Sequence, residues 1–337
     1  MPIILSCNEL VQMAMGHWYA QIIYVTARLQ IVEIIAQGKT SLEEIALATK
    51  TDKKALYRLF RVLVNLGLLN ELENAHFQLN SIADYLKKDH PQSIWATVMM
   101  MGNPERYQAW GELLYSIQTG NSAFEHCFEE NMFDYLAHNP ESAYFYQQTM
   151  KRFSGIEAKA ITKAYDFSSF DLFVDIGGGY GELLTQLLSL TKHQRGILFD
   201  KSYVIEKAKN LYEQSQFKDR LQYIEGSFFE AIPSHGDAYF LKNILHDWND
   251  NKALEILQNC YNGMPNHASL FILEDVIDSG LNDISTTLLD LNMLIIYQGG
   301  KERSQQEFEE LLAKANFNLD QIITTEDNIC ILKCYKN

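Results

Sequence analysis

The stretch Asp171-Leu-Phe-Val-Asp-Ile-Gly-Gly-Gly-Tyr-Gly181 decides the fold. Its apolar run, 172–176, has the length and residue types of a buried strand. Three glycines and then Gly181 follow, and residues 182–188 have the apolar spacing of a helix. A strand, a glycine turn and a helix form the entrance to a nucleotide-type pocket, because glycines allow the backbone to approach a ligand closely.

The positions of the glycines discriminate between ligands. Gly177, Gly179 and Gly181 leave Glu182 where a dinucleotide fingerprint needs its last glycine. Asp175, at the end of the strand, also disfavours a pyrophosphate and suits a ligand that carries a positive charge. The pattern therefore favours a cationic ligand over a dinucleotide.

A second predicted strand, 196–200, ends in Asp200. This is the spacing at which an acid binds ribose hydroxyls. A lone glycine-rich loop is often an ordinary tight turn, and the placement of Asp200 is what favours a nucleoside site. Asp175, the glycines and Asp200 together resemble the S-adenosylmethionine (SAM) site of class I methyltransferases.

The overall composition limits the classes of protein. The 337 residues suffice for two domains, and 47% hydrophobic and 21% charged residues are typical of a globular protein. The net charge of −15 argues against broad binding to nucleic acid or to an anionic membrane. No apolar run approaches the roughly 20 residues that span a bilayer, and no signal peptide is evident. The five cysteines form no metal-spaced cluster, so we expect a cytoplasmic protein with reduced thiols.

The N-terminal segment has the pattern of a winged helix. Residues 8–36 carry apolar residues at helical spacing, and Ser41 with Glu44 forms a capping-box-like helix start. A further helix is predicted over 51–66. Residues 68–79 are predicted to form a short hairpin, the wing.

A winged helix has two interpretations. As a DNA reader, its third helix would present four cations to phosphates: Lys53, Lys54, Arg58 and Arg61. As an interaction module, it would pack against a partner subunit and leave these cations solvated. Residues 39–89 contain eight Lys or Arg against seven Asp or Glu. Because this is no basic patch, the second interpretation is favoured.

The rest of the chain indicates an α/β domain preceded by helices. Residues 92–165 are predicted to be helical and are rich in Met, Tyr, Phe and Trp, which makes Tyr146 and Met150 candidates to line an aromatic substrate cavity, although such residues are more often core. From residue 172 onward strands and helices alternate, which predicts a parallel sheet covered on both faces. The predicted strands, of which the last two form an antiparallel edge, are 172–176, 196–200, 221–224, 238–241, 269–274, 319–325 and 328–335. The predicted helices are 181–190, 202–213, 250–261 and 304–315.

A histidine follows the fourth of these strands. Ligands of an open α/β sheet bind beyond the carboxyl ends of the strands, so His246 is expected in the active crevice. Glu274 ends the next strand, and Glu302 lies in the glycine-rich loop 299–303. Two carboxylates near one imidazole fix its tautomer and stabilise the charge it acquires on taking a proton. A histidine satisfied within a loop is the alternative. No oxygen-ligand cluster of a magnesium site is evident, so the predicted chemistry is metal-free.

Five pieces of sequence carry a resemblance to the SAM-dependent small-molecule O-methyltransferases. This group includes plant caffeic acid and animal hydroxyindole O-methyltransferases and many bacterial secondary-metabolite enzymes. The pieces are Asp-Ile-Gly-Gly-Gly-Tyr-Gly (175–181), Leu-Lys-Asn-Ile-Leu-His-Asp-Trp (241–248), Leu-Glu-Asp (273–275), Leu-Asp-Leu-Asn-Met-Leu (289–294) and Gly-Gly-Lys-Glu-Arg (299–303). The resemblance covers nearly the whole chain, and in this family the winged helix is a dimerisation domain.

The resemblance implies a role for each matching residue. His246 matches the catalytic base, flanked by Glu274 and Glu302. The expected cofactor contacts are Asp175, Gly177, Gly179, Asp200, Ser227, Phe228 and Lys242. The expected acceptor contacts are Met150, Asp247, Asn292 and Met293, together with Tyr146 from the aromatic segment.

Two positions depart from the family pattern. Ser227 stands where the family usually has an aspartate before its double aromatic, so it is able to bond adenine only as a neutral group. Lys201 and Ser202 follow Asp200 where the family tends to have Leu-Pro, which leaves the ribose contact intact and changes the following turn.

The sequence therefore predicts a Rossmann-like, seven-stranded class I methyltransferase domain at 99–337, in which 99–165 line the acceptor pocket and 166–337 form the core. A winged-helix dimerisation domain at 1–98 precedes it. The predicted function is that of a cytoplasmic, homodimeric, metal-independent O-methyltransferase that uses SAM, releases S-adenosylhomocysteine (SAH), and acts on a hydroxylated, aromatic small molecule, with no nucleic-acid or membrane partner. N- or C-methylation, or loss of transfer, is the alternative within the family. A SAM-sensing winged-helix regulator is the alternative of another class.

Overall fold

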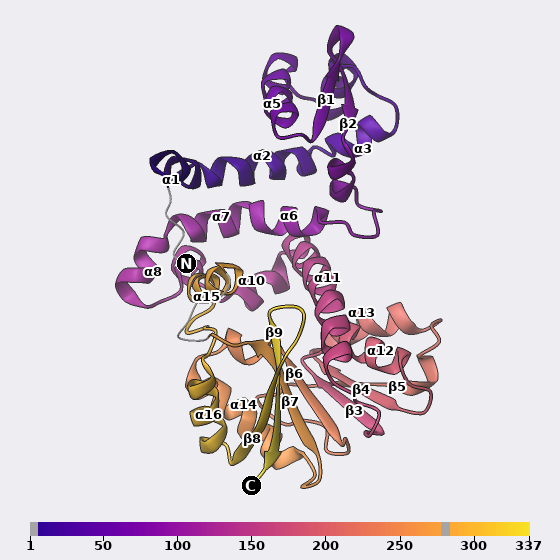
Figure 1. Ribbon diagram of the computed structural model, residues 1–337, viewed down its shortest axis with the longest axis vertical. Coiled ribbons are helices and arrows are strands. Elements are labelled where there is room, and N and C mark those ends of the chain that lie inside the picture. The colour runs from indigo at the N-terminus through magenta and orange to yellow at the C-terminus, as the bar shows by residue number, and fades with distance from the viewer. Residues whose placement is uncertain (1–5, 278–283) are drawn as a thin grey trace. The chain divides into compact units, whose positions relative to one another are not determined.

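The computed structural model describes residues 6–277 and 284–337 (Figure 1). The chain divides into two compact units, residues 1–107 with 139–149 and residues 108–138 with 150–337. Helices α7 (Pro104–Gly111) and α11 (Pro140–Ala164) each contribute residues to both units.

The first unit contains the predicted helices and hairpin. Ser41 Oγ accepts a hydrogen bond from the Glu44 N–H at the start of α4, and Asp52 caps α5 by accepting from the Ala55 N–H. β1 and β2 pair in antiparallel fashion and form the wing. The elements are α1 (Cys7–Ala14), α2 (Gly16–Arg28), α3 (Ile31–Ala36), α4 (Leu42–Thr49), α5 (Lys53–Asn65), β1 (Leu69–Leu72), β2 (His76–Leu79) and α6 (Trp95–Gly102).

The helical spacing over residues 8–36 does not correspond to one continuous helix. The structure has three helices here, with breaks at Met15 and at Leu29–Gln30. Gln30 has a left-handed backbone with φ of 53°, which no helix interior accommodates. The apolar spacing continues on both sides of the breaks, so the pattern alone does not reveal them.

The second unit is built on the predicted seven-stranded sheet (Figure 1). The strand order is β5-β4-β3-β6-β7-β9-β8, with β9 antiparallel to both of its neighbours and the remaining pairs parallel. The strands are β3 (Leu172–Ile176), β4 (Arg195–Asp200), β5 (Leu221–Glu225), β6 (Ala238–Lys242), β7 (Ser269–Asp275), β8 (Phe317–Thr324) and β9 (Ile329–Lys336). The predicted fold class is therefore confirmed.

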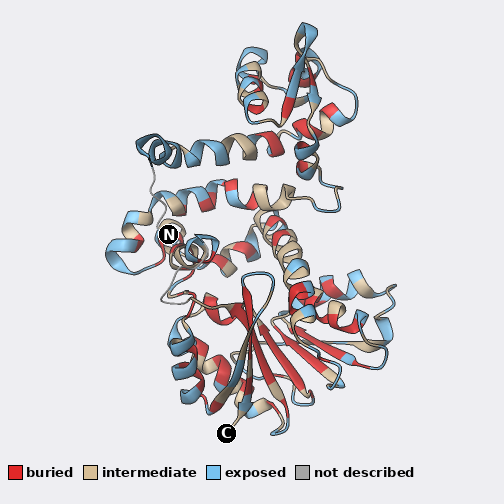
Figure 2. Cartoon of the chain, in the orientation of Figure 1, coloured by how far each residue is buried: buried red, intermediate tan, exposed pale blue. Residues whose placement is uncertain are grey.

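Helices cover both faces of this sheet. One face packs Val174 and Tyr239 against Ile256 of α14, whereas the alternate residues Phe173 and Phe240 belong to the core on the opposite face. Figure 2 shows the central strands as buried along their length. Each such side chain contributes roughly 1.5–3 kcal/mol through burial. The helices of this unit, besides α7 and α11, are α8 (Leu113–Thr119), α9 (Ala123–Phe128), α10 (Met132–His138), α12 (Glu182–Ser189), α13 (Ser202–Tyr212), α14 (Asp250–Gly263), α15 (Ile284–Ile296) and α16 (Gln305–Lys314).

The parallel strands β3 to β7 end at one edge of the sheet, which places the turns after β3, β4, β5 and β6 together. Helix α15 is an addition to the predicted helices. Within the described residues, no helix is long and apolar enough to cross a membrane.

Candidate active site

The glycine turn after β3 requires glycine at its first position. Gly177 has a φ of 67°, and a β-carbon there would lie 2.6 Å from Ile244 Cδ1. Its neighbour Gly179 has a φ of 59° and open space around it. The turn therefore runs close against the turn after β6 and leaves room on its other side.

Asp175 lies beneath this turn. It is 1% exposed, and neither carboxylate oxygen has a hydrogen-bond partner among the described residues. A β-carbon at Gly178 would lie 2.5 Å from Asp175 Cγ, so only glycine fits above the carboxyl group. Burial raises the pKa of Asp175 to about 7, while Lys242 opposes this shift. A buried carboxyl group without partners suits a ligand that donates hydrogen bonds or carries a positive charge.

Asp200, the last residue of β4, lies next to the glycine turn. Its Oδ2 accepts from the Gly179 N–H at 2.8 Å, and its Oδ1 accepts from the Lys201 N–H at 2.6 Å. Burial raises the pKa of Asp200 to about 6. Each oxygen retains a further lone pair, so the carboxylate is held in place and still has acceptor capacity for two hydroxyls.

The turn after β5 supplies an aromatic wall. A β-carbon at Gly177 would lie 3.4 Å from the Phe228 ring, and that ring packs 4.9 Å from Phe229 and 6.3 Å from Trp248, centroid to centroid. Ser227 Oγ accepts from the Phe229 N–H at 3.3 Å, which leaves its hydroxyl proton available as a donor. Asp175, Asp200, Ser227, Phe228 and the glycines therefore fit a nucleoside with a cationic substituent.

Lys242, the last residue of β6, is paired within the chain. Its Nζ lies 2.8 Å from Glu157 Oε2 of α11, and Asn243 Nδ2 donates to the same oxygen at 3.0 Å. No sequence pattern pointed to Glu157, because the two partners are 85 residues apart.

His246 lies buried in the turn after β6. Its Nδ1 is 2.8 Å from Glu302 Oε1, and its Nε2 is 3.6 Å from Asp247 Oδ1, which is too long for a hydrogen bond. Burial alone would lower the pKa of His246, but Glu302, Asp247 and Glu274 outweigh it and raise the pKa to about 10. When the ring is neutral, the Glu302 carboxylate favours the tautomer with the proton on Nδ1, so that Nε2 is the nitrogen able to accept a proton.

Glu274 was predicted to lie beside the imidazole ring, but it contacts the backbone of the turn instead. Its Oε1 accepts from the backbone N–H groups of the turn, at 3.0 Å from Ile244 N and 3.2 Å from His246 N, and also from Leu245. Burial raises the pKa of Glu274. The two flanking carboxylates are therefore not interchangeable: Glu302 contacts the ring, and Glu274 holds the backbone that carries it.

Arg303 is a second support of this turn that the sequence prediction missed. It is 1% exposed and donates to Leu245 O at 2.7 Å, to Trp248 O at 2.8 Å and to Asp250 Oδ1 at 2.9 Å. The sequence feature that could have pointed to Arg303 is its position next to Glu302, in the loop after α15.

The predicted acceptor residues come from several elements. Asn292 Oδ1 accepts from Trp110 Nε1 at 3.2 Å, and Met293 is 4% exposed. Asp247 and Met150 are half-buried in the second unit, whereas Tyr146 belongs to the first unit. The acceptor role of all five residues remains a prediction.

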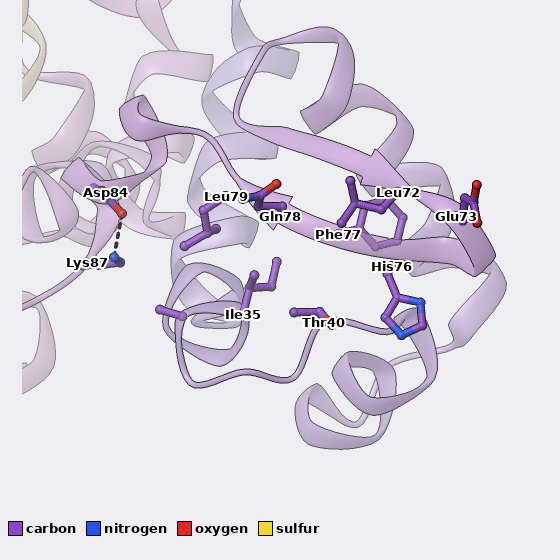
Figure 3. A pocket seen from close by; sticks show the side chains of 11 residues that line it. Ile35, Thr40, Leu72, Glu73, His76, Phe77, Gln78, Leu79, Asp84 and Lys87 are labelled. Carbon is purple, nitrogen blue, oxygen red and sulfur yellow. Dashed lines mark ion pairs between the residues drawn. The ribbon is translucent and has the colours of Figure 1, made fainter.

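A pocket of about 960 Å³ lies elsewhere, in the first unit between α3 and the wing (Figure 3). Phe77 and Ile35 line it, and the Asp84–Lys87 ion pair lies at its rim. It contains none of the predicted catalytic or cofactor residues. In residues 6–277 and 284–337 no group of three or more His, Cys, Asp or Glu side chains is arranged to hold a metal ion, and metal independence stays a prediction.

Two family models match the chain. Residues 110–318 match the O-methyltransferase domain, and residues 11–89 match the O-methyltransferase dimerisation domain. The phenazine O-methyltransferase PhzM of Lysobacter antibioticus is 36% identical over 324 residues, which cover 96% of this chain and 94% of the relative. The seven-stranded sheet with its glycine turn is that of a class I methyltransferase. The chain belongs to the O-methyltransferase family with an N-terminal dimerisation domain.

Two solved structures extend the comparison. The O-methyltransferase NcsB1 of neocarzinostatin biosynthesis, in complex with SAM and 2-hydroxy-5-methyl naphthoic acid, has a TM-score of 0.83 at 28% identity and covers 95% of this chain and 96% of its own. The N,N-8-amino-8-demethyl-D-riboflavin dimethyltransferase RosA of Streptomyces davawensis has a TM-score of 0.87 at 29% identity, with coverage of 99% and 100%. The family thus contains both O- and N-methyltransferases.

Proposed function

We propose that this chain transfers a methyl group from SAM to a hydroxyl group of a small aromatic molecule, with His246 as the general base. The observation that carries this proposal is the imidazole whose Nδ1 is 2.8 Å from Glu302 in the turn beside the glycine loop. SAM, when bound, supplies an electrophilic methyl group on a positively charged sulfur atom.

The residues of the chain would hold this cofactor as follows. Asp200 accepts from the ribose hydroxyls, and Ser227 and Phe228 bind the adenine through a hydroxyl group and a ring face. The glycines allow the backbone to approach the centre of the cofactor. Lys242 and Asp175 bind the charged amino-acid end of the cofactor. The two unpartnered oxygens of Asp175 support this assignment, because a buried carboxylate is stabilised by a cationic neighbour.

His246 removes the proton of the acceptor. A phenol has an ordinary pKa near 10, so at neutral pH it is mostly protonated and a poor nucleophile. The raised pKa of His246, about 10, matches that of a phenol and makes the imidazole a strong base once it is neutral. Glu302 stabilises the imidazolium that forms, and Glu274 keeps the ring in place through the backbone.

The direct test is incubation of the purified protein with labelled SAM and a panel of phenols, with mass identification of the product. A methyl ether of one phenol is the expected result. Methylation of an aromatic amine would show that the acceptor is an amino group and not a hydroxyl group. This second candidate is supported by RosA, a dimethyltransferase that acts on an amino group. Transfer to neither class would overturn the proposal.

We also propose a cytoplasmic homodimer that forms through the N-terminal domain. Several large apolar residues of α1 and α2 are exposed: Leu10 (61%), Val11 (54%), Met13 (62%) and Trp18 (54%). Such a patch favours burial in an interface. Cys7, Cys127, Cys260 and Cys334 are free thiols, which suits a reducing compartment. Light scattering at micromolar concentration should give twice the monomer mass, and deletion of residues 1–36 should give monomeric or insoluble protein; a monomeric full-length chain would contradict the proposed dimer.

A further inference from the structure

Lys242 lies among three carboxylates at the end of β6. It pairs directly with Glu157 at 2.8 Å, and both side chains are mostly buried, at 11% and 19% exposure. Asp175 and Glu182 also interact electrostatically with Lys242. Both of these acids have buried oxygens without a hydrogen-bond partner among the described residues, but Glu182 Oε1 also lies 3.9 Å from Lys151 Nζ. Asp175 is therefore the acid that competes most directly with Glu157 for Lys242.

The position of Glu157 is fixed by its helix. Its neighbours on α11, Ala158 and Ile161, are 0% exposed and belong to the core that includes Phe173. The carboxylate is thus presented from an element that is anchored in the core. Glu157 also accepts from the Asn243 side chain, so it ties α11 to the turn that follows β6.

We propose that Glu157 is a positioning residue for cofactor binding: it holds the Lys242 ammonium where it meets the carboxylate of the cofactor's amino-acid end, and it thereby keeps Asp175 free for the cofactor's ammonium. This inference rests on the proposed function. Without Glu157, Lys242 would turn to Asp175, because an ion pair satisfies a buried carboxylate that lacks a partner. Both groups would then be lost to the ligand.

The test uses calorimetry with two ligands. SAH carries the amino-acid end, and 5′-methylthioadenosine lacks it. Glu157→Gln should weaken SAH binding about ten- to a hundredfold, the loss expected for charge-assisted hydrogen bonds, and leave 5′-methylthioadenosine within about twofold. Glu141→Gln is the matched control, because Glu141 lies on the same helix and forms only an exposed pair with Arg28.

Two further variants separate positioning from a general loss of structure. In a Lys242→Met background, Glu157→Gln should cause no further loss of SAH affinity, because Glu157 acts through Lys242. Glu157→Asp keeps the charge on a shorter side chain and should recover part of the affinity. Additive losses in the double variant would overturn the proposal.

The number of protons released on ligand binding is a quantity that a purely structural role of Glu157 would leave unchanged. The groups that face Asp175 are Lys242, Asp200 and Glu182. A cationic ligand that meets Asp175 should drive a proton from it near pH 7, and calorimetry in buffers of different ionisation enthalpy measures this proton. In Glu157→Gln the proton release should vanish, because Lys242 already ionises Asp175.

The outcomes are distinguishable from failure of the proposed function. If the wild type binds neither ligand, the proposed cofactor is wrong. If the wild type binds SAH and Glu157→Gln weakens both ligands equally, or neither, the cofactor stands and the role of Glu157 is wrong.

Discussion

The turn after β6 and the turn after β3 face the same edge of the sheet but are built in opposite ways. The first is tied from several directions: Glu274 holds its N–H groups, Arg303 holds its carbonyl groups, and the Lys301 N–H donates to His246 O at 2.9 Å. The second leaves both oxygens of Asp175 without a hydrogen-bond partner, whereas Glu274 and Glu302 in the first each leave only Oε2 without one. Unsatisfied buried groups cost free energy, so Asp175, which has no hydrogen bond within the described chain, has the most to gain from a ligand, whereas Glu274 and Glu302 already bond the turn that carries the base.

The largest effect on activity is expected from replacing His246 in the turn after β6. His246→Gln should lower kcat by about a hundredfold or more, because general-base catalysis typically contributes about 10²–10⁴ in rate. The affinity for SAH should stay within about twofold, since the cofactor residues are untouched. His235→Gln, at an exposed histidine, is the control. A variant that keeps more than about a third of the activity would show that the acceptor is already ionised and that proximity suffices.

A substitution beside the glycine turn should change the affinity for the cofactor and not the rate of methyl transfer. Asp200→Ala removes a charged acceptor of two hydroxyls, and such bonds are worth roughly 1.5–3 kcal/mol. The dissociation constant of SAM in calorimetry should therefore rise about ten- to a hundredfold. Asp200→Asn, which keeps one acceptor oxygen, should lose less, and Asp219→Ala is the exposed control. An unchanged constant would remove Asp200 from the site.

The pH dependence of the rate sharpens the distinction between the two supports of His246. The base must be neutral, so kcat should rise with pH through the pKa of His246, which lies near 10. Glu302→Gln removes the carboxylate that contributes most to this raised pKa, so the rise should move to lower pH by at least about one unit, and the plateau should fall about tenfold because the tautomer is no longer fixed.

Glu274→Gln provides the matched comparison. Glu274 contacts the backbone of the turn, so this variant should lower the melting temperature and shift the rise in rate less than Glu302→Gln does. Equal shifts for both variants would mean that the two acids act on the ring alike, as the sequence alone suggested.

The sequence predicted the sheet and the edge where the site lies, because apolar runs such as 172–176 specify buried strands and parallel strands end together. It also predicted that His246 and Glu302 share this edge. It did not predict which group Glu274 contacts, since a strand end fixes the location of a residue but not the direction of its side chain. Glu157 was missed for a related reason: its helix pattern indicates a buried face, not a partner 85 residues away. The break at Gln30 depends on one backbone angle that apolar spacing does not encode.

The last prediction separates the two turns by the pH dependence of stability. The folded pKa of Asp175 is about 7, above an unfolded value near 3.9, and that of His246 is about 10, above an unfolded value near 6.5. In both cases the folded state binds the extra proton, so stability is fully present below the unfolded pKa and is lost as pH rises through the folded pKa. The free energy of unfolding should therefore fall between about pH 4 and 7 because of Asp175, and between about pH 6.5 and 10 because of His246, each by no more than about 1.4 kcal/mol per pH unit.

Urea denaturation at fixed protein concentration measures both ranges. Asp175→Asn should flatten only the lower range, and His246→Gln only the upper one, because each variant removes one of the two titrating groups. If Asp175→Asn left the slope below pH 7 unchanged, Asp175 would already be ionised in the folded chain. It would then have a cationic partner before any ligand arrives, and the contrast between an assembled catalytic turn and an unsatisfied glycine turn would be lost.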